Sequence, residues 1–246
     1  MKRSTWNDRT ETLDALFGGR LQVVQRKDGY RFSIDALLLA HFVGPHPGDR
    51  VIDLGTGCGI IPLILAFRRK VQRIVALEIQ PPLAELARRN AALNRFCRRI
   101  SVWERDLKEL GKGREAGTFD WAISNPPYRR LGAGRVNPRA EKALARHEIG
   151  ATLGDILRAA RDLLREKGRL ALVYPASRGG ELLGILGNFG LEPKRLQFVH
   201  SREGGNARLL LLEAAKGGGA QLQVLPPFIL LGPSGEYTPA AENLFR

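Results

Sequence analysis

Cysteine, histidine and long apolar runs are scarce in this chain. Two cysteines, Cys58 and Cys97, are too few for a disulfide framework and suit a reducing compartment. These cysteines and the four histidines show no spacing typical of metal ligands, so we expect no metal. No run of about 18 apolar residues exists to cross a bilayer, and the N-terminus has no apolar signal core. We therefore expect a soluble, cytoplasmic protein that does not bind a membrane.

Acidic residues are also few relative to basic ones. The 246 residues include 25 Asp and Glu against 39 Lys and Arg, which gives a formal net charge of +14. This excess favours a polyanionic partner, and we expect nucleic acid because no amphipathic basic helix indicates a membrane surface. A basic, solvated surface without a partner is the alternative interpretation. The oligomeric state is not indicated.

The first 44 residues predict a hairpin followed by a helix. Residues 21–25 and 30–32 flank an Asp-Gly pair, Asp28-Gly29, which favours a tight turn between two strands. Ser33 is a candidate N-cap for a helix over residues 35–43, which ends before Gly44-Pro45.

From residue 51 onward, short apolar runs alternate with helical patterns. This alternation predicts a mainly parallel sheet with right-handed crossovers. The expected strands are residues 51–54, 74–77, 100–103, 121–123 and 170–174, and the expected helices are residues 60–67, 81–94 and 153–165. Residues 195–200 and 209–213 predict an antiparallel pair at the C-terminal edge. We expect three regions: an N-terminal segment (1–44), an α/β domain (45–215) and a C-terminal tail (216–246).

A glycine-rich turn follows the first strand of the α/β region. Gly55, Gly57 and Gly59 come directly after Asp53, but Ile60 occupies the position where a dinucleotide fingerprint requires its last glycine. A P-loop is excluded as well, because it requires Gly-Lys-Ser/Thr. A carboxylate beside a turn without a phosphate cradle suits S-adenosylmethionine, which is cationic and carries no phosphate.

Two more carboxylates follow the next two strands. Glu78 ends the second strand, where it can accept hydrogen bonds from both ribose hydroxyls, and Asp106 follows the third strand, where it can contact an adenine amine. Because ligands of open α/β sheets bind beyond the carboxyl ends of the strands, we expect these carboxylates to line one crevice with Asp53. Each of them alone could be only a loop cap.

The fourth strand leads into Asn125-Pro126-Pro127-Tyr128. Two prolines stiffen this backbone and push the residues before them into extended conformations. The Asn125 side-chain oxygen and the Pro126 carbonyl can accept the two N–H bonds of a planar amine, while Tyr128 stacks on its ring. The alternative is a plain strand that ends in a proline turn.

Residues 53–128 resemble class I S-adenosylmethionine-dependent methyltransferases with an Asn-Pro-Pro-Tyr motif. Residues 25–40, 145–148 and 212–217 are similar to blocks of bacterial tRNA adenine-N6 methyltransferases that act on position 37 of a valine tRNA. The resemblance implies a Rossmann-like sheet of seven mainly parallel strands, with helices on both faces and an antiparallel C-terminal pair. It implies catalytic roles for Asn125, Pro126 and Tyr128. It also implies a cofactor site that comprises Arg31, Asp35, Asp53, Gly55, Thr56, Gly57, Gly59, Glu78, Ile79, Asp106, Leu107 and Asn125, with Arg31 and Asp35 near the methionine end.

The segment after the tyrosine is strongly basic. Between residues 129 and 147, six cations accompany one acidic residue, Glu141. Such a segment beside the reacting group suits phosphate contacts that position RNA, although a solvated basic loop is the alternative. The predicted RNA-binding residues are Arg129, Arg130, Arg135, Arg139, Lys142 and Arg146.

Three other functions stay open at this point. The Asn-Pro-Pro-Tyr motif also serves methylation of a glutamine amide in release factors, but those enzymes usually carry an N-terminal helical domain, and only 52 residues precede Asp53 of the first motif here. Guanine-N2 methylation of ribosomal RNA uses the same core, often in a duplicated form. A non-catalytic RNA-binding protein that keeps the cofactor fold is the third.

Overall fold

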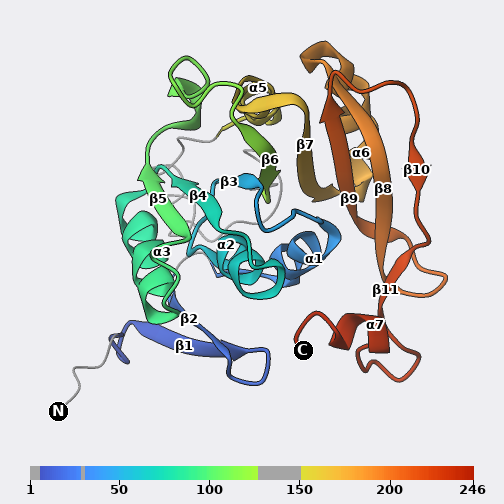
Figure 1. Cartoon of the computed structure of the whole chain (residues 1–246). Helices are drawn as coiled ribbons and strands as arrows, with labels where there is room; N and C mark the ends of the chain where they lie inside the picture. The colour runs from blue at the N-terminus through green and yellow to red at the C-terminus, as the bar shows by residue number, and fades with distance from the viewer. Residues whose placement is uncertain (1–5, 29–30, 127–150) are drawn as a thin grey trace, which may run out of the picture.

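The central feature of the molecule is a twisted, mostly parallel sheet (Figure 1). The computed structural model describes residues 6–28, 31–126 and 151–246. Within these residues the sheet has nine strands in the order β10-β8-β9-β7-β6-β3-β4-β5, and β11 also pairs with β8. The strands are β3 (Arg50–Leu54), β4 (Arg73–Glu78), β5 (Ile100–Glu104), β6 (Phe119–Ser124), β7 (Leu164–Pro175), β8 (Leu191–Arg202), β9 (Ala207–Lys216), β10 (Gln223–Val224) and β11 (Phe228–Leu231).

Strand direction follows the expected fold class. The pairs from β5 through β7 are all parallel, whereas β9 runs antiparallel to both β7 and β8. The predicted Rossmann-like α/β architecture and its antiparallel C-terminal pair are confirmed. The expected number of seven strands is too low, since β10 and β11 extend the edge beside β8. These two strands are two and four residues long and lie on either side of a proline pair, so their pattern is too short to indicate strands.

Helices cover both faces of the sheet (Figure 1). The first face packs against α1 (Ile34–Phe42), α2 (Ile60–Ile64) with its continuing π-helical turn (Leu65–Arg69), and α3 (Pro81–Leu93). The second face packs against α5 (Leu153–Leu163) and α6 (Gly179–Leu186). Successive strand residues alternate between these cores, so that Val51 faces the first and Ile52 the second. Short 3₁₀ turns lie at Leu107–Glu109, Ala176–Arg178 and Gly187–Phe189, and α7 (Pro239–Glu242) packs against β11.

The N-terminal hairpin differs from the prediction. Strand β2 (Leu21–Arg26) pairs with β1 (Glu11–Leu16), which precedes it, and not with residues 31–32, the described part of the expected partner strand. The turn lies at Phe17-Gly18-Gly19, where all three residues adopt positive φ angles. Glycines reach this backbone region without a steric penalty, so the Gly-Gly pair forms the turn that Asp28-Gly29 was expected to form. The sequence of β1 concealed it, since three of its six residues are polar and only Leu16 on that strand is buried.

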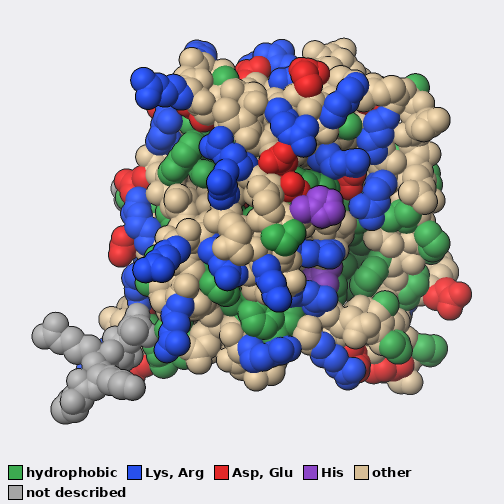
Figure 2. Space-filling view, in the orientation of Figure 1, with side chains coloured by type: hydrophobic (Ala, Val, Ile, Leu, Met, Phe, Trp, Pro, Cys, Tyr) green, Lys and Arg blue, Asp and Glu red, His purple; other side chains and the backbone are tan. Residues whose placement is uncertain are grey.

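The helix after the hairpin matches its expected range to within a residue at each end. Both cysteines are free, Cys58 buried and Cys97 exposed. In the part of the chain that the structure describes, no helix is long and apolar enough to cross a membrane. Lys and Arg side chains are spread over the visible surface rather than gathered at one spot (Figure 2).

Candidate active site

Four of the predicted site residues lie along the carboxyl edge of the sheet. Strands β6, β3 and β4 are adjacent and parallel, with Asp53 opposite Ala76 on one side and Ile123 on the other. Glu78 is the last residue of β4, where it is opposite Glu104 of β5. Asp106 follows β5 and Asn125 follows β6, so all four residues emerge at the same end of neighbouring strands. The parallel register therefore produces the shared edge that the sequence predicts.

The glycine-rich turn is fixed to the end of β4. The backbone N–H groups of Gly55 and Thr56 both donate to the Leu77 carbonyl, at 3.0 and 2.8 Å. Gly55, Gly57 and Gly59 have φ angles of 80°, 58° and 85°, in the left-handed region that favours glycine. A Cβ at Gly55 would meet nothing within 4 Å, so the backbone there faces open space.

Asp53 is a buried carboxylate, and only one of its two oxygens accepts a hydrogen bond from the described residues. Its Oδ2 accepts a hydrogen bond from Thr56 Oγ1 at 2.6 Å, whereas its buried Oδ1 has no hydrogen-bond partner among the described residues. Burial raises the pKa of Asp53 to about 7; the Thr56 hydrogen bond opposes this rise and the negative charge of Glu78 adds to it. A cation or hydrogen-bond donor at Oδ1 would relieve the cost of this buried group.

The other two carboxylates are held by the backbone. Glu78 Oε2 accepts from the Gly57 N–H at 2.9 Å and Oε1 from the Gln80 N–H at 3.0 Å, so both oxygens keep a lone pair for a ligand. Asp106 Oδ1 accepts from the Lys108 N–H at 2.9 Å and caps a 3₁₀ turn. Asp106 is thus a loop cap, and its Oδ2 accepts no hydrogen bond from the described residues. Ile79 and Leu107, the half-buried residues that follow Glu78 and Asp106, lie at the same edge.

Asn125 and Pro126 lie directly beside the glycine-rich turn. Ser124, the last residue of β6, donates from Oγ to the Leu54 carbonyl at 2.8 Å, which joins the ends of β6 and β3. Asn125 is half-buried and Pro126 is buried. Pro127, Tyr128 and the predicted RNA-binding residues (Arg129, Arg130, Arg135, Arg139, Lys142 and Arg146) lie outside the described residues.

The N-terminal residues of the predicted site have partners within their own segment. The Arg31 guanidinium donates to Thr12 Oγ1 at 2.7 Å and forms an ion pair with Asp14 at 2.8 Å. Asp35 lies in the first turn of α1, and burial raises its pKa, although a Ser33 hydrogen bond opposes that rise.

A buried asparagine that the sequence analysis missed connects this segment to the glycine-rich turn. Asn90 of α3 accepts from the Val24 N–H at 2.8 Å and donates to the carbonyls of Val24 and Cys58, each at 2.9 Å. Its side chain is fully buried. The available signal was a polar residue on the apolar stripe of an amphipathic helix, between Leu86 and Ala91.

Comparison with known proteins agrees with this architecture. Residues 31–190 match the model of the methyltransferase small domain family. The chain belongs to this family. A relative from Aeromonas hydrophila, named tRNA1(Val) (adenine(37)-N6)-methyltransferase, is 34% identical over 184 residues, which is 74% of this chain and 75% of the relative. The family resemblance expected from the sequence is confirmed.

Solved structures show the same fold. A crystal structure from Agrobacterium tumefaciens, described as that of a predicted O-methyltransferase, is 27% identical with a TM-score of 0.69, and covers 85% of this chain and 94% of its own. The structure of M. jannaschii TYW2 in complex with AdoMet has a TM-score of 0.56, covers 85% of this chain and 87% of its own, and at 14% identity shows the fold alone.

Proposed function

We propose that this protein transfers a methyl group from S-adenosylmethionine to the exocyclic N6 amine of an adenine in tRNA, at anticodon-loop position 37. The single observation that carries the proposal is the placement of Asn125-Pro126 next to Asp53 and the glycine-rich turn, at the ligand-binding edge of a methyltransferase-family sheet. The name of the Aeromonas relative supports the choice of adenine and tRNA. It favours this reaction over methylation of release factors or ribosomal RNA. We expect the enzyme to act in the cytoplasm.

The residues at the edge fit this cofactor. The buried, unpaired Oδ1 of Asp53 suits a cationic ligand, and the open space at Gly55 allows close approach to the backbone. Glu78 is held by two backbone N–H groups and would accept from the ribose hydroxyls, and Asp106 would accept from the adenine amine. Bound S-adenosylmethionine supplies an electrophilic sulfonium methyl group.

Asn125 and Pro126 would activate the target amine. An amine conjugated to a purine is a poor nucleophile because its lone pair is delocalised into the ring. Two acceptors, the Asn125 side-chain oxygen and the Pro126 carbonyl, favour a pyramidal nitrogen and stabilise the positive charge that develops on it. No base is required in advance, since the proton can leave the methylated nitrogen to water. Orientation of the nitrogen by these fixed acceptors supplies a further part of the rate.

Two proposed contacts fall on the segment outside the described residues. Tyr128 would stack on the adenine and replace the stacking that the base loses when it leaves the RNA. The basic segment from Arg129 to Arg146 would contact phosphates and position the RNA.

A transfer assay with several acceptors tests the proposed reaction. Purified protein is incubated with radiolabelled S-adenosylmethionine and, in parallel, with unmodified tRNA, ribosomal RNA or release factor. We expect label in tRNA alone. Label only in ribosomal RNA or release factor would keep the chemistry and refute the substrate, and tight cofactor binding without label in any acceptor would favour a binding protein.

A further inference from the structure

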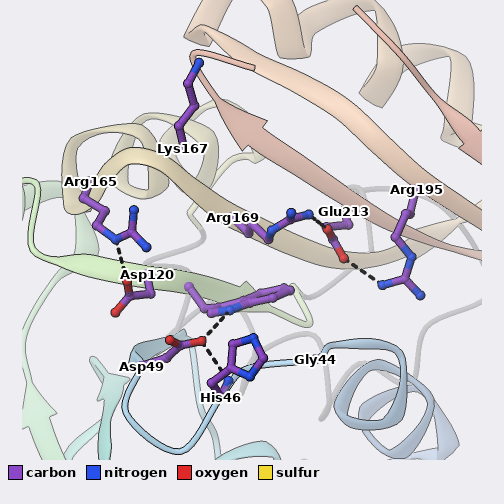
Figure 3. A pocket seen from close by; sticks show the side chains of 10 residues that line it. Gly44, His46, Asp49, Asp120, Arg165, Lys167, Arg169, Arg195 and Glu213 are labelled. Atoms are coloured by element: carbon purple, nitrogen blue, oxygen red, sulfur yellow. Dashed lines mark hydrogen bonds and ion pairs between the residues drawn. The ribbon is translucent and has the colours of Figure 1, made fainter. Parts of the chain in front are cut away.

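A cavity of about 410 Å³ is lined by charged side chains (Figure 3), and its lining residues place it at the opposite end of the sheet from the candidate active site. It is bounded by the loop between α1 and β3, by the first residues of β6 and β7, and by residues of β8 and β9. Ligands of open α/β sheets bind at the carboxyl ends of the strands, so this amino-end cavity is not part of the expected cofactor crevice.

Glu213 is a buried carboxylate that pairs with two arginines in this cavity. Its side chain is 2% exposed and accepts hydrogen bonds from Arg169 and, at 2.9 Å, from Arg195. The two arginine side chains remain 45% and 34% exposed. Arg169 lies over the ring of Trp121, and Arg195 lies 4.6 Å from the ring centroid of Phe42. One carboxylate thus holds two guanidinium groups, which leaves a net positive charge and unused N–H donors.

The other carboxylates of the cavity are also engaged by donors of the protein. Asp120 accepts from the Arg50 N–H at 2.8 Å and from Arg165, whose side chain is 54% exposed against 20% for Asp120. Asp49 accepts from the His46 N–H and from Trp121 Nε1, at 2.8 and 3.2 Å.

A cationic surface results at the mouth of the cavity. The Lys167 side chain points away from the three arginines (Figure 3), and its ammonium donates to the Gly217 carbonyl. Among the charged side chains here, Glu213 is 2% exposed, whereas Arg165, Arg169 and Arg195 are 54%, 45% and 34% exposed, so the guanidinium groups are the more exposed charges.

We propose that this cavity binds a backbone phosphate of the RNA substrate, at a site separate from the methylated base. The inference rests on the proposed function. Exposed, aromatic-backed guanidinium groups match the geometry of phosphate oxygens, which they can contact in a bidentate manner. Such contacts fix the position and orientation of a nucleic acid without reading its sequence.

The position of the cavity limits which RNA can use it. Trp121 of β6 lines the cavity, and Asn125 comes four residues later, just after the end of β6. The two residues are therefore roughly 13 Å apart through the protein and further apart around its surface. We place this contact on a part of the tRNA outside the anticodon stem-loop, because the stem-loop carries the adenine at the carboxyl end of the sheet and the cavity lies at the other end.

Binding of two RNAs by single-charge variants tests this inference. The dissociation constants of full-length tRNA and of a short anticodon stem-loop are measured for the wild type, Arg169→Gln and Arg195→Gln. Each variant leaves the other arginine to pair with Glu213, and the thermal midpoint of each checks folding. Arg246→Gln is the matched control, because it removes one charge from an exposed ion pair at the C-terminus. Methyl transfer by the wild type reports separately on the proposed function.

We expect both cavity variants to weaken tRNA binding roughly five-fold or more while stem-loop binding changes less than two-fold, and the salt dependence for tRNA to fall by about one counterion. Arg246→Gln should leave both constants unchanged. Equal weakening for both RNAs, or no change for either, would overturn the inference. A third result would also overturn it: inorganic phosphate raises the thermal midpoint of the wild type but not that of Arg169→Gln, while tRNA binding is the same for both. That result would assign the cavity to a free phosphate.

Discussion

Asn90 and Asn94 make the same type of contact from the same helix and differ in burial, which gives a controlled prediction of stability. Asn90 forms three buried hydrogen bonds to backbone groups of Val24 and Cys58. Asn94 accepts from the Gln22 N–H at 2.9 Å and donates to the carbonyls of Gln22 and Asn90, at 2.6 and 2.8 Å. The contacts of Asn94 with Gln22 are exposed to solvent.

The substitution Asn90→Ala would leave three buried polar groups without partners. Each such group costs about 1–3 kcal/mol, so we expect a loss of at least about 3 kcal/mol from a total of roughly 5–15 kcal/mol. In Asn94→Ala, water can replace the side chain, and we expect a loss below about 1 kcal/mol.

Urea titration followed by circular dichroism measures this difference. With a denaturant dependence of about 3 kcal/mol per molar, the midpoint of Asn90→Ala should fall by about 1 M and that of Asn94→Ala by less than about 0.4 M. Equal shifts for the two variants would refute the reasoning, because the argument depends on burial and not on the number of hydrogen bonds.

Two further predictions concern Asp53 and the glycine-rich turn that follows it. Burial raises the pKa of Asp53 to about 7, whereas an unfolded aspartate titrates near about 3.9, so the folded state binds the proton more tightly and loses stability as pH rises between these values. Asp53→Asn should therefore gain stability relative to the wild type between pH 5 and pH 8 in urea titrations, and a pH-independent difference would contradict the assignment. Gly59→Ala should lower the free energy of unfolding by about 1–2 kcal/mol, because Gly59 has a φ of 85° and the new Cβ would lie 3.2 Å from the Cβ of Ala87. The control Gly48→Ala should change it by less than about 0.5 kcal/mol, because Gly48 has open space around it and no positive φ. Similar thermal midpoints for the two variants would contradict this prediction.

The alternating part of the fold could be predicted from the sequence because three of its strands, β3, β4 and β6, are almost wholly buried. The runs that became β3, β4 and β6 are short, apolar and followed by turn residues, so their ends place Asp53, Glu78 and Asn125 at one edge. That placement follows from parallel strand order alone and needs no side-chain detail.

The N-terminal hairpin and the edge strands could not be predicted in the same way. The two acidic residues of β1 have their partners outside the strand, since Glu11 pairs with Arg89 of α3, 78 residues away, and Asp14 pairs with Arg31, 17 residues away. Strands β10 and β11 gain their pairing from β8, not from their own pattern. The hydrogen bonds of Asn90 could not be predicted either, because their partners lie 32 and 66 residues away in the sequence.

Nucleoside analysis of methylated tRNA tests the central claim most directly. Unmodified tRNA is incubated with S-adenosylmethionine and either the wild type or Asn125→Ala, then digested and examined for N6-methyladenosine by mass spectrometry. Removal of one preorganised acceptor from a transition state costs about 10²–10³ in rate, so we expect N6-methyladenosine with the wild type and at least about 100-fold slower formation with the variant. A methylated nucleoside other than N6-methyladenosine, or an equal rate for Asn125→Ala, would contradict the account.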